Sequence, residues 1–320
     1  NFMDYFQSLK EDCREDLAVI KGELRSQETD GWYTLANTAS SRIYLKQMNA
    51  RCEALFVRAA EPLAAMAYEW GMEYPHDLLA YGWKTLMQNH PHDSICGCSV
   101  DAVHREMVTR FEKAEQVALH IIEESLSYLA GHMDSRGFRE RDGEAVPFFV
   151  VNPTGYRKSQ TAEAVLTVKK YPFQGSTVAA CLEKAQKEKL PAYRIVDRAG
   201  NTVPGRVEEL PYAFGYDLPK DRFRNAYFCR KVRVTLEVED MDPFTLESFC
   251  LLPAGEEEEK GSRESLFTGD NTMENRRLSC RVNSNGTVDI THKESGVTYR
   301  EAVMLEDTTD IGNEYIYFKP

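Results

Sequence analysis

RIYLKQMNARCEALFVRAAEPLAAMAYEW, residues 42–70, is the stretch that decides the first part of the fold. Its apolar residues recur at steps of three and four, which is typical of one face of a long helix. This face consists of Leu45, Met48, Cys52, Leu55, Ala59, Leu63, Met66 and Trp70. Because Pro62 lacks a backbone donor, we expect a kink or an interruption near residues 58–62.

Two further helices are predicted after this stretch. One runs from about His76 to Asn89, and the other continues to about Gly131 with Ser99 as its N-cap. Between them, a proline at position 91 and a glycine at position 97 disfavour helical geometry, so residues 92–98 are predicted to form a loop. Three helices with short connections indicate a three-helix bundle.

The apolar period changes from 3.6 to 2 after Gly143, and everything downstream is predicted to be β-structure. The clearest strand places four apolar residues on one side: Val232, Val234, Leu236 and Val238. Further strands are expected at residues 148–152, 161–168, 193–197 and 245–252. An Asn285-Gly286 pair between two alternating segments predicts a hairpin. The expected class is therefore α+β multidomain, a three-helix bundle followed by mainly antiparallel β-sandwich domains.

Composition limits the classes of partner. The 320 residues carry 51 acidic and 39 basic side chains, a net charge of -12, which disfavours nucleic acid as a partner. We find no apolar run of about 18 residues, and so we expect no membrane span. The eight cysteines show no disulfide framework and indicate a cytoplasmic protein with reduced thiols. Exposed strand edges and an uncovered bundle face favour association into homo-oligomers.

The segment Asn89-His-Pro-His-Asp-Ser-Ile-Cys-Gly-Cys-Ser99 concentrates chemically active side chains. One interpretation is a binding module with a small structural zinc site formed by His90, His92, Cys96 and Cys98. Their spacing argues against it, because structural zinc sites pair ligands in two separated halves, whereas these four lie within nine residues. In the other interpretation, one histidine and one aspartate belong to a site that is completed elsewhere. His90 continues an apolar helical stripe and is then a core residue.

This segment, followed by Asp101, Val103, His104, Arg105, Glu106 and Arg110, resembles the middle-domain signature of glycoside hydrolase family 38 α-mannosidases. The bacterial branch that includes mannosylglycerate hydrolase is the most similar. Residues 22–26, 41–47, 61–63, 149–153 and 274–320 are also similar to segments of that family, so the resemblance covers nearly the whole chain.

The resemblance implies retaining, zinc-dependent hydrolysis of an α-mannoside or a mannosylglycerate-like sugar. It implies that His92 is a zinc ligand, that Asp93 binds sugar hydroxyls, and that Tyr315 reaches the sugar from a β-sandwich. Retention requires two carboxyl groups about 5 to 5.5 Å apart. In the family, the nucleophile, the acid/base and the other zinc ligands belong to an N-terminal barrel, and no residue here matches them.

We therefore expect a part of a longer α-mannosidase that lacks the catalytic barrel and is inactive on its own. The expected domains are the tail of the catalytic domain at residues 1–30, the helical middle domain at 31–142, a β-domain at 143–255, and a linker with the start of a C-terminal β-sandwich at 256–320. No catalytic residue is assigned in this chain, and we do not expect it to retain zinc alone.

Overall fold

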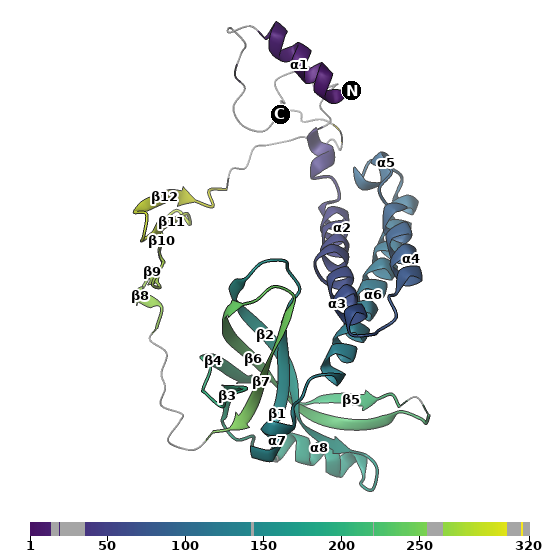
Figure 1. Ribbon diagram of the computed structural model, residues 1–320, viewed down its shortest axis with the longest axis vertical. Coiled ribbons are helices and arrows are strands. Elements are labelled where there is room, and N and C mark those ends of the chain that lie inside the picture. Colours follow the sequence, from purple (N-terminus) through teal and green to yellow (C-terminus); the bar gives the residue numbers. More distant parts are fainter. Residues whose placement is uncertain are drawn as a thin grey trace. The chain divides into compact units, whose positions relative to one another are not determined.

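The computed structural model describes residues 1–13, 19, 36–141, 144–219, 221–254, 265–305 and 315 (Figure 1). Helices come first and antiparallel sheets follow, so the predicted α+β class is confirmed. The described residues divide into two compact units. One comprises those within 1–50 and 84–113 together with Tyr315, and the other comprises those within 51–83 and 114–305.

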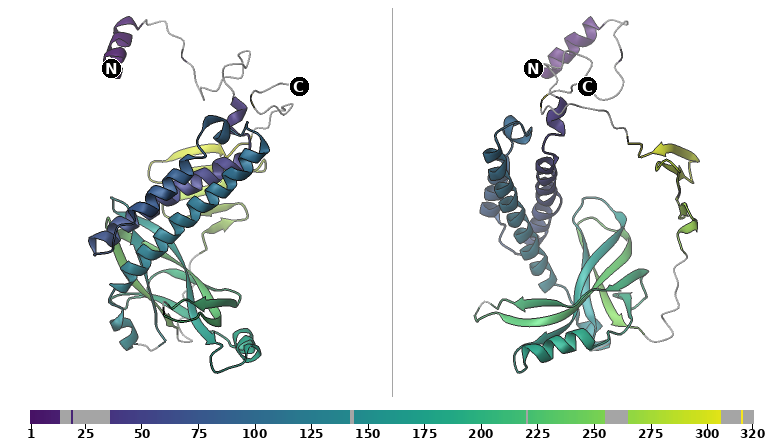
Figure 2. Two further views of the ribbon diagram at one scale, coloured as in Figure 1. Left: turned by 90° about the vertical axis from the view of Figure 1, so that its right-hand side faces the viewer. Right: turned by 180° about the vertical axis from the view of Figure 1, so that it is seen from behind.

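The long helices follow the predicted order, and Figure 2 shows them from two further sides. The helical elements are α1 (Phe2–Asp12), η1 (Ala36–Ala39, 3-10), α2 (Ile43–Leu55), η2 (Phe56–Ala60, π-helical), α3 (Glu61–Glu69), α4 (His76–Met87), α5 (His92–Ile95), α6 (Asp101–Gly131), α7 (Arg136–Arg141) and α8 (Val178–Lys187). None of the helices among the described residues combines the length and the apolar character needed to cross a membrane.

The interruption predicted around Pro62 is confirmed, and it takes the form of the π-helical turn η2. There the backbone N–H of Glu61 donates to the carbonyl of Phe56, five residues back. Pro62 then occupies the first turn of α3, where its ring nitrogen cannot donate to a carbonyl of the preceding π-turn. A π-turn of this kind lets the chain pass a proline without losing the helical direction.

The predicted apolar faces of the helices form their buried core. On the face predicted for residues 42–70, the buried residues are Leu45, Cys52, Leu63 and Met66. In α4 and α6, the buried apolar residues at helical spacing are Leu79, Leu86, Met107, Phe111, Ala114, Ala118, Ile121 and Leu129. Trp70 is an exception, because it lies at the end of α3 and is 53% exposed. The predicted cap at Ser99 is wrong by one position, because α6 begins at Asp101 and Val100 precedes it.

The strands confirm the predicted alternation. They are β1 (Val146–Asn152), β2 (Lys158–Pro172), β3 (Tyr193–Asp197), β4 (Gly205–Glu209), β5 (Ala213–Asp217), β6 (Asn225–Met241), β7 (Thr245–Pro253), β8 (Phe267–Gly269), β9 (Thr272–Glu274), β10 (Leu278–Val282), β11 (Val288–His292) and β12 (Val297–Ala302). One sheet has the order β1-β7-β3, and a second has the order β2-β6-β4 with β5 also paired to β6. All named pairs are antiparallel.

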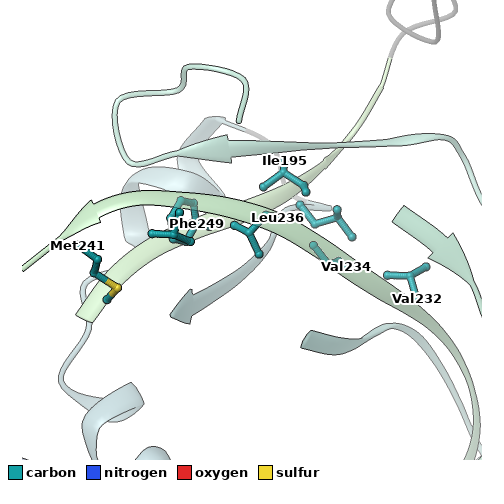
Figure 3. Close-up of a cluster of buried hydrophobic side chains, with 8 residues drawn as sticks. Ile195, Val232, Val234, Leu236, Met241 and Phe249 are labelled. Atoms are coloured by element: carbon teal, nitrogen blue, oxygen red, sulfur yellow. The ribbon is translucent and has the colours of Figure 1, made fainter. Parts of the chain in front are cut away.

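Strand β6 supplies the centre of the β core (Figure 3). Its residues Val232, Val234, Leu236 and Val238 are at most 3% exposed, while Glu237 is exposed. They pack with Ile195 of β3 and with Phe249 and Leu251 of β7. The apolar side of β6 therefore joins the two sheets into one core.

The expectation of β-structure throughout the second half is wrong at α8. Thr177 caps this helix by accepting a hydrogen bond from the backbone N–H of Ala180. Its buried residues Cys181 and Ala185 pack against Tyr171 of β2. A threonine cap followed by apolar residues four apart was the sequence signal for this helix.

A separate five-stranded sheet has the order β12-β11-β10-β9-β8. The predicted Asn285-Gly286 hairpin is confirmed, because β10 pairs with β11 and Gly286 has a φ of +82°. The start of the predicted linker, residues 256–264, lies outside the described residues.

Candidate functional site

The one-turn helix α5 carries His92 and Asp93, so the predicted loop at residues 92–98 is wrong in part. Pro91 precedes the helix with a φ of -48° and a ψ of 136°, and its carbonyl accepts from the backbone N–H groups of Ser94 and Ile95. Proline before a helix fits this role, since the fixed φ is suited to a helix start. The residue taken as a helix breaker therefore starts a short helix.

The C-terminal side of α5 is closed by Gly97. Its φ is +82°, and its N–H donates to the carbonyl of Ser94 at 3.0 Å. The next N–H, that of Cys98, donates to the carbonyl of Asp93 at 3.3 Å, and Ser99 N–H donates to the same carbonyl at 3.2 Å. Glycine in the left-handed conformation followed by this pair of bonds is the Schellman end of a helix. The carbonyl of Asp93 is thus held by two backbone hydrogen bonds.

The side chains of the predicted site residues on α5 point to solvent. The side chain of His92 is 91% exposed and that of Asp93 is 67% exposed, with His92 Nε2 3.5 Å from Asp93 Oδ1. An accessible imidazole can ligate a metal, and an accessible carboxylate can accept hydrogen bonds from hydroxyl groups. The short helix therefore presents two different ligand groups next to each other.

Cys98 connects Asp93 with Tyr315, which is far away in the sequence. The Cys98 thiol donates to Asp93 Oδ1 at 3.6 Å, and it also makes a side-chain hydrogen bond with Tyr315. Burial raises the pKa of the Cys98 thiol, and the bond from Tyr315 acts in the opposite direction. Tyr315 is held by its carbonyl, which accepts from the N–H of Asn37 at 3.3 Å. The structure thus brings Asp93 and Tyr315, both predicted to bind sugar, to one place.

The other donors of the hypothetical zinc knot point to other partners. His90 is half-buried, and its Nε2 lies 2.7 Å from Oδ1 of Asn49. Cys96 is half-buried near Lys46, where burial lowers the pKa of the lysine. Among the residues described, no three His, Cys, Asp or Glu side chains converge as a metal site.

Of the two histidines in the segment around α5, only His92 therefore offers a zinc ion an exposed imidazole. One ligand does not hold zinc, which takes four in structural sites and three protein ligands in catalytic ones. The residues fit the donation of a single ligand to a larger site, and they do not fit a self-contained site.

Several polar residues around α5 were not identified as site residues from the sequence. Arg42 donates to the carbonyl of Gly97 and forms an ion pair with Asp101 at 2.7 Å. Asn89 is fully buried, and its side-chain N–H donates to the carbonyl of Met107. His104 is 1% exposed, and neither ring nitrogen has a hydrogen-bond partner among the described residues. The contacts of Arg42 and Asn89 join segments that are distant in the sequence, so no local pattern indicates them.

Comparison with known proteins identifies two family domains. Residues 34–129 match the family described as alpha mannosidase middle domain. Residues 143–253 match the family described as glycosyl hydrolases family 38 C-terminal domain 1. The first match contains α5 and both of its exposed ligand groups.

Three relatives match nearly the whole chain. A protein of Halalkalibacterium halodurans named "Putative mannosylglycerate hydrolase" is 38% identical over 99% of this chain and 35% of its own length. An alpha-mannosidase of Enterococcus faecalis V583 has a TM-score of 0.83 at 44% identity, with 100% of this chain and 36% of that chain covered. Another Enterococcus faecalis structure, a protein in the glycosyl hydrolase family 38, has a TM-score of 0.80 at 39% identity, with the same coverage.

The chain thus spans about a third of the length of these relatives. Its two domain matches lie next to each other in the order middle domain, then C-terminal domain 1. The chain therefore belongs to glycoside hydrolase family 38, of which it carries the middle domain and the first C-terminal domain.

Proposed function

We propose that this chain is part of a retaining α-mannosidase that hydrolyses α-mannosides with the help of zinc. The observation that carries the proposal is the exposed pair of His92 and Asp93 on α5, inside the matched middle domain. The names of the relatives support the same substrate class, either a general α-mannoside or mannosylglycerate.

Each site residue has a role that its chemistry supports. Asp93 accepts hydrogen bonds from sugar hydroxyls, since a carboxylate is a strong acceptor. Tyr315, 39% exposed, adds a phenolic group that both donates and accepts. His92 supplies one zinc ligand through a neutral imidazole. When bound, zinc supplies Lewis-acid attraction for oxygen atoms of the substrate.

The nucleophile and the acid/base come from outside this chain in our proposal. Retention requires two carboxyl groups about 5 to 5.5 Å apart with opposite tasks, and we assign no such pair here. We also propose the division into a helical domain at residues 31–142 and a β-domain at 143–255, which the family matches at 34–129 and 143–253 support. A cytoplasmic location is supported by the eight cysteines, all of which are free thiols.

Hydrolysis of an aryl α-mannoside tests this function. The 320-residue chain is expected to release no aryl group above the rate in buffer. The full-length protein is expected to release the aryl group with retention of configuration at the anomeric carbon, which NMR of the sugar product measures. Turnover by the chain alone would show that the nucleophile lies within it. A full-length protein that hydrolyses neither aryl α-mannosides nor mannosylglycerate would overturn the substrate class.

A further inference from the structure

Two residues, one just before α2 and one within it, contact the two flanks of α5. Arg42 immediately precedes α2 and contacts Gly97, on the C-terminal side of α5. Asn49, seven residues later on α2, contacts His90 on the N-terminal side. We call Arg42 and Asn49 the α2 clamp.

The C-terminal contact of the clamp is the more elaborate one. The carbonyl oxygen of Gly97 accepts from Arg42 Nε at 3.1 Å and from Ser41 Oγ at 3.3 Å. The same guanidinium reaches Asp101 Oδ1, at the start of α6, at 2.7 Å. One arginine thus joins the start of α2, the end of α5 and the start of α6. A guanidinium is suited to this because it presents several donors in a rigid plane.

The backbone of Arg42 supports a specific role. Its φ is +49°, a left-handed conformation that residues with a Cβ adopt rarely. Such a conformation persists only where the surrounding contacts enforce it. It directs the arginine side chain to Gly97 and Asp101 at the cost of a less favourable backbone.

The N-terminal contact of the clamp joins His90, which lies just before α5, to Asn49 of α2. Its Nε2 lies 2.7 Å from an amide oxygen of Asn49, which accepts a hydrogen bond only if Nε2 carries the proton. Nε2 then has no lone pair for a metal, whereas Nδ1 keeps one. The contact therefore ties the beginning of α5 to α2 through His90.

We propose that Arg42 and Asn49 are positioning residues, which hold α5 so that His92 and Asp93 keep a fixed geometry. This inference rests on the proposed function, in which those two side chains serve the site. A site residue displaced by about 1 Å loses on the order of 100-fold in rate, so a turn of four residues needs external support.

The clamp is distinct from the core that holds the helices together. Leu45, Leu86 and Met107 are 0% exposed and provide that core, whereas the Arg42 side chain is 35% exposed. Removal of the clamp is therefore expected to loosen α5 and to leave the helices folded.

Hydrogen exchange and kinetics test the clamp with the variants Arg42→Ala and Asn49→Leu. In the 320-residue chain, both variants are expected to accelerate amide exchange at least about tenfold in the peptide covering residues 92–99, where Cys98 and Ser99 donate to Asp93. In the full-length protein, kcat/KM for an aryl α-mannoside is expected to fall by about 10- to 100-fold. The thermal midpoint is expected to stay within about 3 °C of wild type.

Two controls separate positioning from general loss of structure. Asn49→Asp keeps an acceptor oxygen for His90 and is expected to retain wild-type exchange and activity. Arg51→Ala removes another arginine of α2, one that pairs with Glu115 of α6 at 2.6 Å, and it is expected to change neither readout.

Unchanged exchange at residues 92–99 in both clamp variants would overturn the proposal, as would equal acceleration in Arg51→Ala. Only the kinetic arm depends on the proposed function. A full-length wild type without α-mannosidase activity would overturn that function, and the exchange measurement would still decide whether Arg42 and Asn49 hold α5.

Discussion

Replacement of Gly97 by alanine tests how closely α5 sits against the start of α2. A Cβ at this position meets the backbone carbonyl oxygen of Ser41 at 2.9 Å and its Oγ at 3.1 Å. Relief to 3.4 Å requires a displacement of about 0.5 Å, because a carbonyl oxygen of the main chain has no rotamer to change. Gly97 must move away from Ser41.

The magnitude follows from two contributions. Holding alanine in the left-handed conformation costs about 1 kcal/mol. The displacement stretches the bonds that the Gly97 carbonyl accepts from Ser41 and Arg42, now 3.3 and 3.1 Å, beyond useful length, at about 1 kcal/mol each. We therefore expect Gly97→Ala to lower the free energy of unfolding of the helical domain by about 3 kcal/mol.

Gly97→Asn is the matched variant, since asparagine tolerates the left-handed conformation but carries the same Cβ. It is expected to remain destabilised by about 2 kcal/mol, the part due to the lost hydrogen bonds. Urea unfolding followed by far-ultraviolet circular dichroism, which reports on helix, measures the stability of both variants. Gly286 has the same φ as Gly97 and open space where a Cβ would be added, so Gly286→Asn should leave the free energy of unfolding unchanged. Recovery of Gly97→Asn to within about 0.5 kcal/mol of wild type would refute the steric argument.

Two further outcomes follow from buried titratable groups. Burial, with Arg42 and Lys46 nearby, lowers the pKa of His104, so the unfolded chain binds more protons and the stability of the fold decreases as the pH drops from 7 to 5. The variant His104→Leu is expected to show a smaller decrease of the thermal midpoint over this pH range. The same decrease as in wild type would contradict this. Burial raises the pKa of Cys52 to about 11, which reduces its thiolate fraction by about 100-fold. A thiol reagent at pH 8 should therefore label the exposed Cys13 before Cys52. Equal labelling rates at the two positions would contradict the burial of Cys52.

The spacing of apolar residues predicted those helices and strands that can be recognised without knowing which segments they pack against. The apolar face from Leu45 to Met66 marks a helix wherever it packs, and the four alternating residues of β6 mark a strand buried on one side. Pro62 indicated the place of the break between α2 and α3, because a missing N–H interrupts the hydrogen-bond pattern of any helix.

Features that depend on contacts between distant segments were not predictable in this way. Arg42 and Gly97 are 55 residues apart, and only the packed helices bring the guanidinium to the carbonyl. The loop prediction around α5 was wrong because Pro91 and Gly97 were taken as breakers of one helix, whereas they start and end another. The resemblance pointed to His92 and Asp93, but only the structure places Tyr315 beside Cys98.

Zinc content of the full-length protein tests the central claim, that this chain donates one zinc ligand, His92, to an α-mannosidase site. Wild type is expected to bind one zinc ion per chain and His92→Ala less than about a tenth of that, with activity lost in parallel and the helical fold retained by circular dichroism. His132→Ala, which removes an exposed histidine at the end of α6, serves as the control and should keep both zinc and activity. Full zinc occupancy and full activity in His92→Ala would contradict the account.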